Sequence, residues 1–238
     1  RDSFPPSEPQ AYFGAEGRSV EKPHFNPPNG VAGPAPVRTS AVAARDALRR
    51  VRAPDQAFAA EGQDFGTTPP PSIKAPPLVG PTPRTLPGGR VVSTAELVSL
   101  LQAENGPVVV DVLPSEQEQR RVIPGAVWFM NIGEGTWRLP ADASGAPAQR
   151  FLRGMAMIAP DKSKPVVFYC SGVRCWYSYN AALRALMAGY QQVYWYRGGL
   201  DAWLQARLPT AVTQAHRTVA DSDAPAAAIY ASARYQGD

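Results

Sequence analysis

The fold is decided by the stretch Val166-Val167-Phe168-Tyr169-Cys170-Ser171-Gly172-Val173-Arg174-Cys175-Trp176. Its first four residues are apolar, β-branched or aromatic, which predicts a short strand buried on both faces. Residues 171–174 are mostly small or polar and include a glycine, which predicts a sharp loop. From Trp176 to Met187 the apolar residues recur with a helical period, and Gly189 follows as a stop signal. The stretch therefore predicts a strand, a tight loop and a helix, with a cysteine at the carboxyl end of the strand.

The position of Cys170 favours reactivity. Ligands of open α/β sheets bind outside the carboxyl ends of the strands, and a loop that enters a helix points free backbone N–H groups forward. These donors and the Arg174 guanidinium would favour a thiolate over a thiol. Cys170 is therefore a candidate nucleophile. The plain alternative is that Cys170 is a small buried apolar residue.

The stretch resembles the active-site loop of the rhodanese family, in which a strand-end cysteine carries a persulfide. The segment, with its Cys-x-x-x-x-Cys-Trp sequence, more closely resembles the rhodanese-like subgroup associated with PQQ-dependent catabolism, which is named for a CXXCW motif. Further matching pieces are spread over roughly residues 90–209, and their order adds to the resemblance. They include Asp111–Pro114, Ile123–Trp128, Asn131–Gly133, Asn180–Ala182 and Gly199–Trp203.

The resemblance implies an α/β rhodanese-like fold and a sulfurtransferase activity towards a donor such as thiosulfate. Cys170 would be the nucleophile that carries the persulfide, Arg174 would attract the anionic donor, and Asp111 would end its strand near the loop. The backbone N–H groups that would hold the persulfide anion belong to Ser171, Gly172, Val173, Cys175 and Trp176. The resemblance also implies export to the periplasm, with which a first residue other than Met is compatible.

Two further functions stay open. Only Ser171 separates Cys170 from the loop glycine, whereas active rhodaneses commonly have two residues there, so the chain could be a non-catalytic accessory or structural subunit of a larger complex, PQQ-linked or other. Alternatively, Cys170 and Cys175 flank one tight loop and could form an internal disulfide of a dithiol redox protein. Their spacing differs from the Cys-x-x-Cys of thioredoxins.

Composition argues against several other classes of function. Two cysteines without a nearby histidine are an incomplete ligand set, so we predict no metal site and no cofactor. The net charge is +4 and the basic residues are scattered, which does not indicate nucleic-acid binding. No stretch approaches the ~20 apolar residues of a membrane-spanning helix.

The chain divides by composition. Residues 1–90 hold 17 of the 26 prolines, whereas all five tryptophans lie beyond residue 127. We therefore predict a proline-rich extended arm at residues 1–87 with one short helix at about 40–52, an α/β domain at 88–210, and a C-terminal tail at 211–238. The arm is predicted to dock on its own domain or to bind a protein partner.

Alternating patterns within residues 88–210 predict a mostly parallel sheet covered by helices on both faces. The charged residues 115–121 are predicted to form a surface loop or a short helix. Besides the central stretch, strands are predicted near 90–92, 108–112, 126–129 and 193–196, and helices from Ser93 or Thr94, at 151–158 and after Gly199.

Overall fold

A five-stranded sheet forms the centre of the structure, a computed structural model that describes residues 46–52, 59–115 and 119–214. The strand order is β1-β6-β5-β2-β4, and all four neighbouring pairs are parallel. The predicted mostly parallel α/β sheet is therefore confirmed. The strands are β1 (Arg90–Val91), β2 (Val108–Asp111), β4 (Val127–Trp128), β5 (Pro165–Tyr169) and β6 (Gln192–Trp195).

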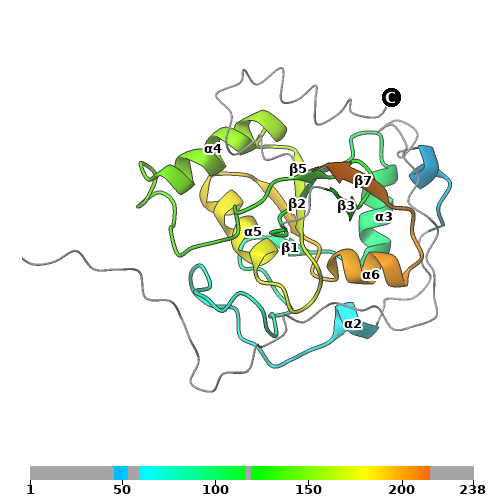
Figure 1. Cartoon of the computed structure of the whole chain (residues 1–238), viewed down its shortest axis with the longest axis horizontal. Coiled ribbons are helices and arrows are strands. Elements are labelled where there is room, and N and C mark those ends of the chain that lie inside the picture. The colour runs from blue at the N-terminus through cyan, green and yellow to red at the C-terminus, as the bar shows by residue number, and fades with distance from the viewer. Residues whose placement is uncertain (1–45, 53–58, 116–118, 215–238) are drawn as a thin grey trace, which may run out of the picture. The chain divides into compact units, whose positions relative to one another are not determined.

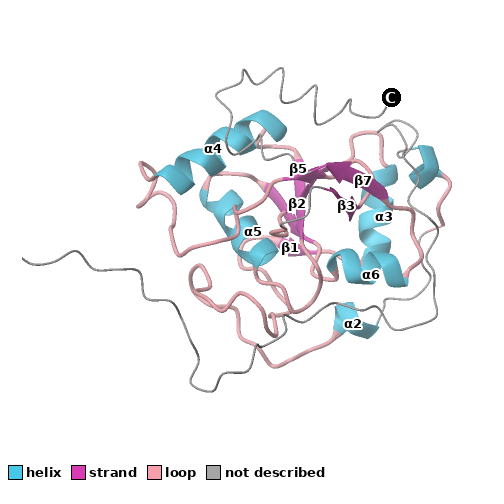
Figure 2. Ribbon diagram, viewed as in Figure 1, coloured by secondary structure: helices cyan, strands magenta, loops and turns pink. Residues whose placement is uncertain are grey.

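Helices cover both faces of this sheet (Figure 1). On one face lie α4 (Ala146–Ile158) and α5 (Tyr177–Met187), and on the other lie α3 (Thr94–Gln102) and α6 (Gly199–Gln205). Figure 2 shows these helices on the two sides of the strands. Among the described residues, no helix has the length and apolar character that a membrane crossing needs.

The side chains of β5 alternate between two apolar cores, as the period of a strand requires. Val167 and Tyr169 pack in the core beneath α3 and α6, whereas Val166 and Phe168 pack in the core beneath α4 and α5. Cys170 continues this alternation and lies in the second of these cores. The cysteine therefore faces α5 and not α6.

The start of α3 agrees with the prediction from sequence. Ser93 is the N-cap residue, and its side chain accepts a hydrogen bond from the Glu96 amide, while the Glu96 carboxylate accepts one from the Ser93 amide. This reciprocal pair is a capping box, which satisfies two amide groups that the helix leaves free.

An antiparallel two-stranded ribbon was not predicted. β3 (Gln119–Val122) pairs with β7 (Ala211–Gln214). The prediction of a loop or short helix at 115–121 is wrong for residues 119–121, and residues 211–214 of the predicted tail form a strand. The two strands lie about ninety residues apart in the sequence, so no short turn joins them. Their pairing therefore could not be predicted from a local turn signal.

The described part of the N-terminal arm packs on the α/β domain. Residues 46–49 are helical, α2 (Ala59–Gly62) follows, and residues 40–45 of the predicted short helix lie outside the described residues. Leu48 is buried beside α3, and its carbonyl accepts a hydrogen bond from Gln102. Residues 73–86, called the proline strap below, contribute Ile73, Leu78 and Leu86 to the core on the α5 side.

Candidate functional site

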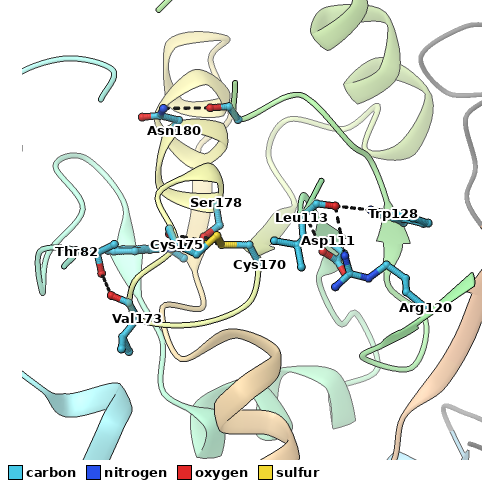
Figure 3. The surroundings of a disulfide bond; sticks show 12 residues. Thr82, Asp111, Leu113, Arg120, Trp128, Cys170, Val173, Cys175, Ser178 and Asn180 are labelled. Atoms are coloured by element: carbon cyan, nitrogen blue, oxygen red, sulfur yellow. Dashed lines mark hydrogen bonds and ion pairs between the residues drawn. A yellow bond between two sulfur atoms is a disulfide. The ribbon is translucent and has the colours of Figure 1, made fainter. Parts of the chain in front are cut away.

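Cys170 and Cys175 form a disulfide at the carboxyl end of β5 (Figure 3). Cys170 directly follows the strand, and Cys175 lies two residues before the first turn of α5. Only 1% of Cys170 and 3% of Cys175 is exposed. Both sulfur atoms are therefore covered by other parts of the chain, although they lie where an α/β sheet places its reactive groups.

Backbone hydrogen bonds engage two of the five N–H groups that were predicted to hold a persulfide. The Cys175 amide donates to the Gly172 carbonyl (3.0 Å), which closes a tight turn within the loop. The Trp176 amide donates to the carbonyl of Leu78 in the proline strap (3.0 Å). In the disulfide form, the Cys175 amide is therefore bonded within the loop and the Trp176 amide is bonded to the strap.

The first turn of α6 packs tightly against the other end of the loop. The amide of Leu200 donates to the Cys170 carbonyl (2.9 Å), and the amide of Asp201 donates to the Ser171 carbonyl (2.8 Å). Gly199 has a φ of +58°, and a Cβ atom there would lie 2.5 Å from the Cys170 carbonyl oxygen. Glycine is therefore required at 199 both by its backbone conformation and by this close approach.

Asp201 is the acidic side chain that packs against the loop. A Cβ atom built on Gly172 would lie 2.6 Å from Asp201 Oδ2, so the carboxylate fills the space in front of that glycine. Burial raises the pKa of Asp201 to about 6. Its place against the loop could not be predicted from sequence, because an acidic residue in the first turn of a helix usually serves only the helix dipole.

The proline strap packs over the loop between the two cysteines. Val79 forms an isolated antiparallel bridge with Cys175, and the Gly80 amide donates to the Arg174 carbonyl (2.8 Å). Thr82 donates twice to the Val173 carbonyl, from its hydroxyl (2.6 Å) and from its amide (3.3 Å). The strap therefore lies beside the disulfide as a short added strand.

Buried Arg197 holds the strap in place. Its Nε donates to Thr82 Oγ1 (3.0 Å) and its Nη2 to the Thr82 carbonyl (3.1 Å), while Nη1 donates to the Glu61 carbonyl (2.8 Å). Arg197 follows β6 by two residues, so it ties the arm to the same end of the sheet that carries the cysteines. No local sequence pattern links positions 82 and 197, so this contact could not be predicted from the sequence.

Arg174, the predicted attractor of an anionic donor, is exposed. Its guanidinium carbon lies 5.8 Å from the centroid of the Phe65 ring, which Arg197 also approaches at 5.5 Å. The side chain thus lies at the surface, near the loop that carries the cysteines, rather than against the sulfur atoms. The structure brings Arg174 and the cysteines into one loop without a described contact between their side chains.

Asp111, the third residue predicted to be catalytic, faces away from Cys170. Its register partner on β5 is Tyr169, whose side chain lies in the core on the α6 side, so Asp111 and Cys170 point to opposite faces. Asp111 is fully buried, pairs with Arg120 (3.3 Å) and accepts a hydrogen bond from the Leu113 amide (3.0 Å) (Figure 3). Its contacts hold the segment that follows β2.

The electrostatics of Asp111 follow from its burial. Burial raises its pKa to about 6, against the opposing effects of Arg120, of the Leu113 amide and of the Tyr169 hydroxyl. Burial, and next the charge of Asp111, raise the pKa of Tyr169 well above its usual range. These groups form one buried polar cluster on the face of the sheet opposite to the disulfide.

Two polar residues of α5 hold the surrounding loops. Asn180 accepts a hydrogen bond from the Lys74 amide (2.9 Å) and donates to the carbonyls of Lys74 (3.0 Å) and Gly133 (3.1 Å). Buried Arg184 donates to the carbonyls of Ile132, Gly135 and Trp137, and burial lowers its pKa to about 9. Together they fix the glycine-rich loop at residues 131–137 and the start of the strap.

Ser178 contacts the disulfide with its side chain, although the sequence did not single it out. Its Oγ lies 3.1 Å from Cys170 Sγ (Figure 3). The same oxygen accepts a hydrogen bond from Trp195 Nε1 (3.0 Å). The contact with Cys170 joins the residue after β5 to the first turn of α5, and it depends on how the loop between them folds. Among the described residues, no group of three or more His, Cys, Asp or Glu side chains is placed to hold a metal ion.

Part of the chain matches a known domain family. Residues 93–206 match the family model of the rhodanese-like domain. The chain is similar to the polysulfide-sulfur transferase homodimer of Wolinella succinogenes, with 18% identity over 56% of this chain and 84% of that one, at a TM-score of 0.37. It is also similar to a thiosulfate sulfurtransferase of Pseudomonas aeruginosa, with 24% identity over 51% of this chain and 20% of that one, again at a TM-score of 0.37. A comparison with curated proteins finds no match.

The matched region begins after the proline strap and ends within the segment that follows α6. It contains the disulfide, both of its flanking elements, and the strands of the parallel sheet except β1. The strap, α2 and the rest of the arm lie outside it. Residues 93–206, which hold most of the parallel sheet and the strand-end cysteine, are thus the part of the chain that is similar to the rhodanese-like domain.

Proposed function

We propose that this chain is a two-cysteine sulfurtransferase, in which Cys170 takes up a sulfane sulfur and Cys175 releases it as sulfide. The observation that carries the proposal is the disulfide between the strand-end cysteine and the last residue of its loop. A rhodanese-like domain with a single cysteine would keep the persulfide until an external acceptor arrives. A second cysteine within bonding distance supplies an internal route for its removal.

The first step requires the reduced protein. The Cys170 thiolate attacks the outer sulfur of a donor such as thiosulfate or a low-molecular-weight persulfide. The sulfur–sulfur bond of the donor breaks, sulfite or a thiolate leaves with its electron pair, and Cys170 carries the transferred sulfur as a persulfide anion. The loop amides and the nearby positive charge of Arg174 support this step, because both favour anionic sulfur.

The second step regenerates the form seen here. The Cys175 thiolate attacks Cys170 Sγ, a bond forms between the two cysteine sulfurs, and the outer sulfur leaves as hydrosulfide after it takes up a proton. A protein or small dithiol then supplies two electrons and reopens the disulfide. The sum of the steps reduces one sulfane sulfur to sulfide at the expense of one dithiol.

A second candidate function is that of a non-catalytic accessory subunit. It is favoured by the burial of both cysteines, 1% and 3% exposed, beneath a strap that lies outside the matched domain. In that case the disulfide would stabilise the loop and would not turn over. A protein partner bound through the arm, and a link to PQQ-dependent oxidation, would belong to this reading and rest on the resemblance of the Cys-Trp motif.

The location proposed for either function is the periplasm. Disulfides persist in oxidising compartments and are rare in the cytosol, so the bond between Cys170 and Cys175 supports the location that the resemblance implies. A sulfur carrier in such a compartment would need a dedicated dithiol reductant. Fractionation of the native host, followed by immunoblotting for the chain, tests the location directly.

The test of the proposed function starts from reduced protein freed of reductant without oxygen. Wild type, Cys170→Ser and Cys175→Ser are each treated with thiosulfate and, separately, with glutathione persulfide. We expect wild type to release sulfide in proportion to protein and to become two hydrogens lighter. Cys175→Ser should instead retain one added sulfur and release none, and Cys170→Ser should do neither.

Two outcomes would overturn the proposal. If Cys175→Ser gains no sulfur from either donor while reduced wild type readily re-forms its disulfide with a mild oxidant, the chain is a dithiol redox protein. If the disulfide of folded wild type resists excess dithiol and opens only on unfolding, the disulfide is structural and the accessory reading takes its place. Intact mass and a sulfide assay distinguish all three functions.

A further inference from the structure

The disulfide has unequal surroundings at its two sulfur atoms. Ser178 Oγ lies 3.1 Å from Cys170 Sγ. Among the described residues, no donor forms a hydrogen bond with Cys175 Sγ. The two cysteines are therefore chemically distinct, although both are buried in the same core.

The direction of the hydrogen bond at Ser178 follows from the inventory of donors. A disulfide sulfur carries no hydrogen, so Cys170 Sγ can only accept. The indole Nε1–H of Trp195 can only donate, and it donates to Ser178 Oγ (3.0 Å). The indole N–H therefore occupies one lone pair of the serine oxygen. The hydrogen of the serine hydroxyl is then directed to Cys170 Sγ.

The indole is itself fixed. Trp195 ends β6 and pairs in register with Phe168 of β5, two residues before Cys170. Its ring packs edge-on against Tyr179 with the ring centroids 5.1 Å apart, and no part of it is exposed. Ser178 is 2% exposed and lies in the first turn of α5. The relay from Trp195 through Ser178 to Cys170 is therefore held by the strand, the helix and the core between them.

We propose that Ser178 is a catalytic residue that stabilises the thiolate of Cys170, and that Trp195 is the positioning residue that directs the serine hydrogen to that sulfur. The proposal deepens the proposed function, because it assigns different roles to the two cysteines of the cycle. A hydrogen bond to an anionic sulfur is stronger than one to a neutral sulfur, so the relay favours Cys170 as the sulfur that carries negative charge.

This asymmetry determines which sulfur atom an incoming thiolate attacks when the disulfide is reduced. The better leaving group in thiol–disulfide exchange is the sulfur whose thiolate is more stable. An incoming thiolate would therefore attack Cys175 Sγ, form a mixed disulfide there, and release Cys170 as a thiolate with the electron pair of the broken bond. A second thiolate of the reductant then frees Cys175. The sulfur that leaves first is the one that must next attack the sulfane donor.

The carbonyl of Cys175 adds a second contact at the same sulfur. It lies 3.5 Å from Cys170 Sγ and could accept a hydrogen bond from the thiol form after reduction. This contact favours the protonated sulfur, whereas Ser178 favours the ionised one. Removal of the serine hydroxyl should therefore move the Cys170 equilibrium towards the thiol.

The first experiment measures the acidity of Cys170 without any sulfur donor. In a Cys175→Ser background, the rate of alkylation of Cys170 by iodoacetamide is followed against pH. We expect Ser178→Ala and Trp195→Phe each to raise the apparent pKa of Cys170 by about one unit, which is about tenfold less thiolate at a pH below it. A profile that coincides with that of the unsubstituted background would overturn the proposal.

Matched controls separate the relay from general effects of substitution. Ser99→Ala removes an exposed serine hydroxyl from α3, where its partner is the Ala95 carbonyl. Trp203→Phe removes an equally buried indole N–H whose partner is the Pro209 carbonyl. Both should leave the apparent pKa of Cys170 unchanged. A shift as large in Trp203→Phe as in Trp195→Phe would show that the effect is one of packing and would count against the relay.

The second experiment needs no substitution and therefore no assumption about folding. Oxidised wild type is treated briefly with excess glutathione, quenched with acid, then alkylated with N-ethylmaleimide and mapped by peptide mass spectrometry. We expect glutathione on Cys175 and maleimide on Cys170. The opposite distribution would overturn the assignment. Because neither experiment uses a sulfane donor, both remain decisive if the chain proves to take up no sulfur.

Discussion

The carbonyl of Val173 accepts two hydrogen bonds from Thr82, one from the hydroxyl (2.6 Å) and one from the amide (3.3 Å). Through this pair, a segment that lies outside the region similar to the rhodanese-like domain closes over the loop between the two cysteines. The same hydroxyl accepts a hydrogen bond from Arg197 Nε (3.0 Å). Access to the disulfide should therefore depend on how firmly the strap is held.

Thr82→Val tests this dependence. The substitution removes the hydroxyl that bonds to both Val173 and Arg197 while it keeps the volume and the backbone bonds. Loss of about 1–2 kcal/mol of strap binding should speed the reduction of the disulfide by a small dithiol about tenfold. Thr85→Val, at an exposed position of the same strap, is the matched control. Equal rates in the two variants would mean that the strap does not limit access.

Gly199→Ala should disturb the loop between the cysteines from the side of α6. A Cβ atom at this position would lie 2.5 Å from the Cys170 carbonyl oxygen and 2.6 Å from the Ser171 carbonyl, and φ is +58°. Because neither backbone can retreat without moving α6, we expect a loss of more than about 2 kcal/mol in the free energy of unfolding.

Gly62→Ala is the control for Gly199→Ala. Gly62 lies in α2, and a Cβ atom there would meet nothing within 4 Å. Its free energy of unfolding should change by no more than about 1 kcal/mol, in the stabilising direction if at all. Urea unfolding followed by tryptophan fluorescence measures both variants, and similar losses in the two would contradict the close approach at Gly199.

Arg184→Met should be among the more damaging single changes in α5. The guanidinium donates to the carbonyls of Ile132, Gly135 and Trp137, so its removal leaves three acceptors, including the one on buried Ile132, without this partner. We expect a loss of about 3–5 kcal/mol, with the glycine-rich loop exposed to proteolysis. Arg153→Met, at an exposed position of α4, should cost less than about 1 kcal/mol. Urea unfolding and limited proteolysis compare the two, and an equal loss would refute the role of Arg184.

Asp201→Asn should change the pH dependence of stability. Burial raises the pKa of Asp201 from 3.8 to about 6 in the folded chain. The folded state therefore binds the proton more tightly than the unfolded state, and this contribution to stability is complete below about pH 4 and is lost as the pH rises through about 6. Relative to wild type, the variant should gain stability across this window, because asparagine does not ionise.

The size of the effect at Asp201 has an upper limit. A change from 3.8 to about 6 corresponds to at most about 3 kcal/mol, and solvent around the part of the carboxylate that is exposed reduces it. The measurement is the difference in the free energy of unfolding between variant and wild type at pH 4 and pH 7. A difference that is the same at both values would show that Asp201 ionises freely in the folded chain.

Local sequence signals were enough to predict the elements that carry the site. The run from Val166 to Tyr169 is apolar on both faces, and only a strand inside a covered sheet satisfies such a run. The capping residues Ser93 and Glu96 set the start of α3, and the change to a helical period after Trp176 set the start of α5. These signals are local, since propensity, period and caps act within a few residues, so the order of strands and helices could be read from them.

Only the tertiary structure decided which side chains meet at the sulfur atoms. The alternation of a strand puts Asp111 and Cys170 on opposite faces once β2 and β5 pair in register, and that register is set by contacts between distant segments. Ser178 meets Trp195, and Thr82 meets Val173, because the sheet and the strap bring them together across 17 and 91 residues. Contacts of this kind depend on the packing of the whole domain, which no local pattern in the chain encodes.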